Sequence, residues 1–63
     1  MKKEVVVGLM TFSVSEGNAE EFGKSLQSDL DQIDYVQIRG FDKREARSRA
    51  IKENCEKFGA EIL

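Results

Sequence analysis

Four basic side chains lie close together in the second half of the chain: Arg39, Lys43, Arg44 and Arg47. They surround the predicted start of a helix, where unpaired backbone N–H groups already form the positive end of the helix dipole. Positive charge at such a place is favourable only beside negative charge, so we expect a negative group nearby. The group could be a phosphate or the acidic surface of a partner, which helix N-termini commonly bind. The sequence lacks both glycine patterns of phosphate-binding loops, G-x-x-x-x-G-K-S/T and G-x-G-x-x-G. The four cations would therefore bind an anion without a glycine-rich loop.

Residues for enzyme chemistry are scarce in this chain. It contains no histidine, the most common general base, and a single cysteine, Cys55, which the helix pattern places toward the apolar side. We interpret Cys55 as a core residue, because one cysteine can form neither an internal disulfide nor a Cys/His zinc site. The carboxylates lie on predicted exposed helix faces, without an apolar pocket that would separate two pKa values. The sequence therefore predicts no catalytic, cofactor-binding or metal-binding residues.

Length and composition favour a small globular domain. With 63 residues, 40% hydrophobic content and a formal net charge of −2, the chain fits one domain over 1–63. A disordered tail would usually have fewer apolar residues and a larger net charge, and a nucleic-acid binder would usually be strongly basic. The polar start Met-Lys-Lys-Glu does not match a signal or membrane-spanning segment, so we expect a cytoplasmic protein without membrane contact. A chain of this size usually needs stabilisation beyond its core, from disulfides, a metal ion or oligomerisation, and only oligomerisation remains for this sequence.

The spacing of apolar residues predicts a small α/β (α+β) fold of the order β-α-β-α, with a short final strand. Glu4–Val14 is rich in β-branched residues and predicts a first strand. Alternation in Asp34–Phe41 predicts a second strand, and Ala60–Leu63 could add a third. We expect a two-layer sandwich with both helices on one face of the sheet.

Capping signals mark both predicted helices. Asn18 is followed by Glu21 at the start of the first helix, and Asp42 is followed by Glu45 at the start of the second. The second helix is expected to end at Phe58–Gly59, where glycine suits the residue after a helix. The first helix carries its apolar residues on one stripe: Ala19, Phe22, Leu26, Leu30 and Ile33.

Both faces of the predicted sheet carry apolar residues, although two helices would cover only one face. The uncovered face would expose five of them: Val5, Val7, Leu9, Tyr35 and Phe41. A soluble monomer rarely leaves such a patch open. We therefore expect this face to pack against a second copy in a homodimer or against another partner.

Three alternatives stay open. With parallel strands, both helix N-termini lie at one edge, so the basic cluster could pair internally with three acidic residues: Glu16, Glu20 and Glu21. Tyr35 and Phe41, with Arg39 between them, could instead form a stacking platform for single-stranded nucleic acid. The helices could also lie on opposite faces and bury the sheet on both sides.

Two stretches resemble known protein families. VVVGLMTFSVSEGNAEEF resembles the opening strand and helix of dimeric ferredoxin-like domains of the antibiotic-monooxygenase type, in which x-x-G-x-x-E-E-F follows a strand. That resemblance implies dimerisation through the sheet. The size, the layout and the tail YVQIRGFDKREARSRAIKENCEKFGAEIL resemble small phage-encoded proteins that bind and disable host factors, including antitoxin-like inhibitors of host ribonucleases. This second resemblance implies a protein that occupies the surface of a host or cellular protein.

Taken with the composition, these patterns predict a small non-enzymatic regulator or inhibitor that acts as a homodimer on a protein partner. The basic cluster is the predicted partner-binding site. A small nucleic-acid-binding regulator is the alternative, and a dimeric ferredoxin-like small-molecule enzyme is the third hypothesis.

Overall fold

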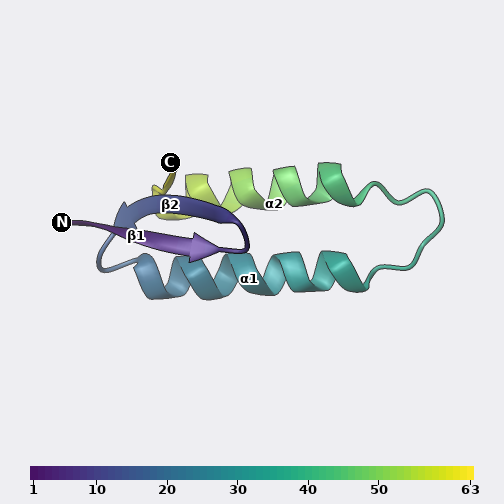
Figure 1. Cartoon of the computed structure of the whole chain (residues 1–63), viewed down its shortest axis with the longest axis horizontal. Coiled ribbons are helices and arrows are strands. Elements are labelled where there is room, and N and C mark those ends of the chain that lie inside the picture. Colours follow the sequence, from purple (N-terminus) through teal and green to yellow (C-terminus); the bar gives the residue numbers. More distant parts are fainter.

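The chain begins with a β-hairpin, continues with a hairpin of two helices and ends with a short strand, as the computed structural model of residues 1–63 shows (Figure 1). In chain order the elements are β1 (Lys2–Val7), β2 (Met10–Ser15), α1 (Ala19–Tyr35), α2 (Lys43–Phe58) and β3 (Glu61–Ile62). The strands form one antiparallel sheet in the order β1-β2-β3, and both helices lie on one side of it. The predicted two-layer α+β class is confirmed, whereas the predicted β-α-β-α order is wrong. All strand pairs are antiparallel, so the condition for the internal pairing of the basic cluster is not met.

The predicted first strand, Glu4–Val14, is in fact two strands joined by a tight turn at Gly8 and Leu9. Gly8 has a φ of +62°, a conformation that other residues adopt only at a steric cost. Glycine at the first central position is typical of the type II′ turn, whose twist matches that of the flanking strands. The run of β-forming residues predicted extended structure correctly but concealed the reversal of the chain.

The turn changes which side chains share a face of the sheet. In one continuous strand, Val5 and Val7 would point to the other face of the sheet from Phe12. In the hairpin, Val5 is the cross-strand neighbour of Phe12, and Val7 is that of Met10. Side chains paired directly across antiparallel strands point to the same side. The outer face of β1 and β2 is therefore polar except for one valine: Lys2, Glu4, Val6, Thr11, Ser13 and Ser15. The prediction of a second apolar sheet face is wrong.

Helix α1 takes up the beginning of the predicted second strand, Asp34–Phe41. The helix continues through Tyr35, and residues 36–42 form the loop to α2. The segment is compatible with both patterns, because its alternation follows directly on an apolar helical stripe that reaches Ile33. The helical pattern prevails because it lets α1 pack along α2.

The two predicted helix starts differ in the structure. Asp42 caps α2, because its carboxylate accepts a hydrogen bond from the Glu45 N–H at 3.1 Å, as the sequence predicted. Asn18 does not cap α1 with its side chain; its amide nitrogen donates instead to the Phe58 carbonyl oxygen, 3.3 Å away at the end of α2. Gly59 ends α2 with a φ of +69°, which confirms the predicted helix end.

The core lies between the sheet and the first half of α1. Four side chains are completely buried: Phe12, Val14, Phe22 and Leu26. The Phe22 ring meets the rings of Phe12 and Phe58 edge to face, with centroids 5.1 and 5.9 Å away. The predicted third strand is present next to this core, because β3 pairs with β2 at Phe12 and Ser13.

The helical hairpin extends beyond the sheet (Figure 1). No residue between 27 and 49 is buried; we call this segment the distal end and the rest of the chain the proximal end. The molecule measures 43 Å along its longest axis and 15 Å along its shortest. Neither helix is long and apolar enough to span a membrane.

Candidate functional site

The four cations of the predicted site lie at the distal end, where α1 leads into α2. Two of them are held by the end of α1: Lys43 Nζ donates to the Asp34 carbonyl oxygen at 2.9 Å, and Arg47 forms an ion pair with the Asp34 carboxylate. Arg39 and Arg44 are exposed and make no ion pair or side-chain hydrogen bond. The cluster therefore consists of two bound and two free cations.

The predicted internal partners of this cluster lie at the opposite end of the molecule. Because α1 and α2 run antiparallel, the start of α1 lies beside the end of α2 (Figure 1). Glu16, Glu20 and Glu21 are therefore proximal, and Glu20 pairs with Lys24 at 3.0 Å. The internal pairing with these three residues is wrong, because it required parallel strands that place both helix starts at one edge.

Arg39 lies in an ordered turn. The Phe41 N–H donates to the Ile38 carbonyl oxygen at 3.2 Å, and Gly40 has a φ of +85°. A positive φ at the third of four residues is typical of a type II turn, where glycine avoids the steric cost. Arg39 thus occupies the second position of a hydrogen-bonded turn.

Three large apolar side chains lie exposed at and after the end of α1. Tyr35, Ile38 and Phe41 have 84%, 72% and 40% of their surface exposed. Arg39 and Arg44 lie in the same stretch of the chain, and we call these five exposed residues the distal tip. Aromatic residues and arginine are over-represented among the side chains that dominate protein interfaces. The distal tip combines both kinds within residues 35–44.

The residues of the predicted dimer or partner face are divided between the two ends. Val7 is buried in the core, and Val5 is half-buried against it, so neither lies on an open surface. Leu9 is fully exposed, but it lies in the turn between β1 and β2. Only Tyr35 and Phe41 remain near each other in the chain, at the distal tip.

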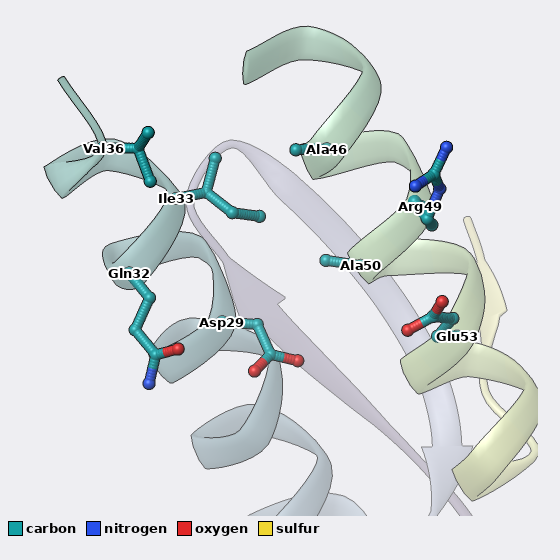
Figure 2. Close-up of a pocket in the computed structure, with 8 residues that line it drawn as sticks. All are labelled: Asp29, Gln32, Ile33, Val36, Ala46, Arg49, Ala50 and Glu53. Atoms are coloured by element: carbon teal, nitrogen blue, oxygen red, sulfur yellow. The ribbon is translucent and has the colours of Figure 1, made fainter. Parts of the chain in front are cut away.

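A groove of about 400 Å³ runs between the helices on the side away from the sheet (Figure 2). Its apolar residues are Ile33, Val36, Ala46 and Ala50, and its polar residues are Asp29, Gln32, Arg49 and Glu53. Arg49 is already paired with Glu45 at 3.1 Å, as its position one turn away predicted. The groove is open to solvent, and the alanines on the α2 side offer little contact area to a ligand.

One buried polar side chain joins the helices beside this groove. Asn54 is 4% exposed, and its amide oxygen accepts a hydrogen bond from the Ser25 hydroxyl at 2.7 Å. Its amide nitrogen donates to the Asp29 carboxylate and to the Ala50 carbonyl oxygen, both at 2.8 Å. Both N–H donors therefore have partners, as burial requires. Such a network favours one alignment of two helices, and that alignment sets the position of the loop between them.

Cys55 is half-buried and packs against the core, as predicted. Burial raises the pKa of its thiol, so less of it is in the nucleophilic thiolate form at neutral pH. No three side chains of the His, Cys, Asp or Glu type are grouped to hold a metal ion. The arrangement at the distal tip suits binding through charge and apolar contact.

Two residues that define the site are missed by the sequence analysis. The strand prediction places Ile38 in a sheet, although Gly40, two residues later, is a signal for a turn. Asp34 has no local signal, because its contacts with Lys43 and Arg47 depend on the antiparallel arrangement of the helices.

Comparisons with protein-family models, with characterised proteins and with solved structures find no match to this chain. The two family resemblances therefore stay predictions. The function has to be argued from the distal tip itself.

Proposed function

We propose that this protein is a small non-enzymatic regulator that binds a protein partner and occupies its surface with the distal tip. The observation that carries the proposal is the exposure of Tyr35, Ile38 and Phe41 on one short segment. Aromatic side chains and arginine contribute most of the binding energy in many protein interfaces. A partner that covers the distal tip would gain the hydrophobic contribution that folding leaves unused.

The accessible surface of the chain is larger than is usual for its mass. It amounts to 4824 Å² at a mass of 7.1 kDa, whereas a monomer of that mass typically exposes about 4,100 Å². The excess of about 700 Å² follows from the elongated shape of the molecule, which measures 43 Å along its longest axis and 15 Å along its shortest. The distal end extends past the sheet (Figure 1). A partner that covers the distal end would add stability to a protein whose core is small.

The charge distribution favours a protein over a nucleic acid as partner. Affinity for nucleic acid depends on several phosphate contacts made by basic side chains. At the distal tip only Arg39 and Arg44 are free to make them. The net charge of −2 on the whole chain would also oppose a polyanion. A nucleic-acid-binding regulator is therefore the alternative that the experiment has to test.

The experiment compares what variants of the chain capture. Immobilised protein would be incubated with a nuclease-treated extract of the organism that makes it, or of its host, and bound proteins identified by mass spectrometry. We expect the double variant Ile38→Ser, Phe41→Ser to lose the captured protein while its helical circular dichroism is unchanged. The matched control Val6→Ser, Leu9→Ser removes two exposed apolar side chains from the proximal end and should still capture it.

Equal capture by the wild type and the Ile38→Ser, Phe41→Ser variant would contradict the proposal. Binding of nucleic acid alone, in an untreated extract, would favour the alternative. The predicted homodimer is a separate question, because the apolar sheet face on which it was based is absent. Sedimentation equilibrium at several concentrations measures the oligomeric state, and a dimer dissociated by the same variant would identify a second copy as the partner.

A further inference from the structure

The four cations near the loop form two pairs with different surroundings. Lys43 and Arg47 each bind Asp34, which joins the start of α2 to the end of α1. Arg39 and Arg44 are exposed and unpaired. Arg47 is already neutralised by a carboxylate and Lys43 is tied to a carbonyl oxygen, whereas a free guanidinium can form two parallel hydrogen bonds with a carboxylate.

We infer that Arg39 and Arg44 bind carboxylates on an acidic protein surface, and that Lys43 and Arg47 position the distal tip through Asp34. The inference rests on the proposed function and specifies the kind of partner and the residues that select it. The apolar side chains of the distal tip supply the remaining contact area.

Charge complementarity favours this occupant over a second copy of the chain. Residues 35–44 contain three basic residues and one acidic residue, Asp42, whose carboxylate already caps α2. A tip-to-tip dimer would bring these cations against the same cations, which costs free energy. An acidic surface makes the interaction favourable and also steers the partner toward the tip.

The backbone at both free arginines is held by hydrogen bonds within the chain. Arg39 lies in the hydrogen-bonded turn, and Arg44 lies in the capped first turn of α2. An ordered backbone loses less entropy on binding, so more of the contact energy is expressed as affinity. The contacts of Lys43 and Arg47 with Asp34 fix where this backbone lies relative to α1, which is the basis of their positioning role.

The test uses two peptides of equal length as probes, one composed of Glu, Leu and Phe and the other with Gln in place of Glu. Amide NMR spectra of isotope-labelled protein report both the binding site and the affinity. We expect the Glu peptide to shift the resonances of residues 35–44. The Gln peptide should bind at least about tenfold more weakly, because unpaired charges at an interface cost at least that much. Affinity for the Glu peptide should fall as salt is added.

Charge reversal tests the two free cations. The double variant Arg39→Glu, Arg44→Glu should lose binding of the Glu peptide while its helical circular dichroism is unchanged. The matched control Lys2→Glu, Lys52→Glu makes the same change in net charge at two exposed proximal positions and should bind like the wild type.

A charge swap tests the positioning role. Arg47→Asp should speed hydrogen exchange of the Val36 and Phe41 amides, the hydrogen-bonded ones of the loop, and weaken binding of the Glu peptide. Adding Asp34→Arg restores the ion pair with opposite polarity, and both slow exchange and affinity should return. If exchange recovers while affinity stays low, Arg47 contacts the acidic partner directly and its assignment here is wrong.

Other results would overturn the acidic partner itself. Equal affinity for the two peptides, or no binding of either, would exclude it. Preferred binding of an oligo-dT strand, with a log–log salt slope of about −0.7 per phosphate contact, would identify nucleic acid instead. Failure of the proposed function is distinguishable, because in that case Ile38→Ser, Phe41→Ser would leave protein capture unchanged. Loss of capture in that variant, without any effect of charge reversal, would retain the distal tip and discard the acidic partner.

Discussion

The two ends of this molecule share the same two helices but differ in what their side chains contact. At the proximal end the helices cover a sheet, and all nine buried residues lie there. At the distal end, residues 27–49 include none, and the loop carries exposed apolar and basic side chains. A fold stabilised at one end leaves the other end free to vary its surface. We therefore expect substitutions to change stability at the proximal end and binding at the distal end.

Two phenylalanines test this comparison with the largest expected effect. Phe22 is completely buried against two other rings, so Phe22→Ala should lower the free energy of unfolding by about 3–5 kcal/mol. That is a large part of the roughly 3–9 kcal/mol expected for a domain of this length. Phe41→Ala should lower it by about 1 kcal/mol, because 40% of the Phe41 surface is exposed and only the rest is covered. Urea denaturation measures both, and a cost above about 2 kcal/mol at Phe41 would mean that the distal tip stabilises the fold.

The Asn54 network lies where the two ends meet, and its loss should have the next largest effect. Asn54→Ala leaves the Ser25 hydroxyl and the Asp29 carboxylate without their partner, which should cost about 1–3 kcal/mol. Gln32→Ala, an exposed substitution at the same groove, is the control and should stay within about 0.5 kcal/mol. Thermal and urea unfolding give both values. An Asn54→Ala variant as stable as the wild type would show that apolar contacts alone align the helices.

The helix caps give a smaller and opposite contrast, because here the stabilising contact lies at the distal end. Asp42→Ala removes a side-chain cap and should cost about 1 kcal/mol. Asn18→Ala removes only an exposed bond to the end of α2 and should cost about half of that or less. Equal costs in urea denaturation would indicate that Asn18 caps α1 in solution after all.

The smallest expected effect concerns the exposed ion pair at the loop. Asp34→Asn weakens the contact with Arg47 and should cost about 0–1 kcal/mol, less at high salt. Its clearer consequence should be faster hydrogen exchange of the Val36 and Phe41 amides, the hydrogen-bonded ones of the loop. Glu20→Gln, which breaks a similar exposed pair at the proximal end, is the control and should leave that exchange unchanged. Identical exchange in both variants would remove the positioning role from Asp34.

The helices were more predictable from the sequence than the sheet. The apolar stripe of α1, the Asp42 cap and Gly59 at the end of α2 all depend on neighbours within a turn or two. The only sequence signal for the β-hairpin is Gly8, and a single glycine within a β-forming run is also compatible with one continuous strand. Because the chain reverses at Gly8, both Val5 and Val7 lie on the inner face of the sheet instead of the outer face. One missed turn therefore makes the prediction of an apolar outer face wrong.

The candidate site was predictable in composition but not in arrangement. The basic cluster is visible in the sequence, yet which cations are free depends on Asp34, which only the helical hairpin brings to Lys43 and Arg47. Tyr35 and Phe41 are predicted as exposed on the face of a sheet, whereas they lie at the end of a helix and in a loop. Contacts between elements decide such placements, and no local pattern contains them.

The loop between the helices, residues 36–42, has a further consequence for how new recognition properties could arise. Because the core and the Asn54 network align the helices from outside this loop, its positions other than Gly40 and the Asp42 cap can change with little loss of stability. Its length is also adaptable, since doubling a flexible loop costs only about 0.6 kcal/mol of closure entropy. The same scaffold could therefore display a library of different loops, through evolution or in the laboratory, while the rest of the chain folds as before.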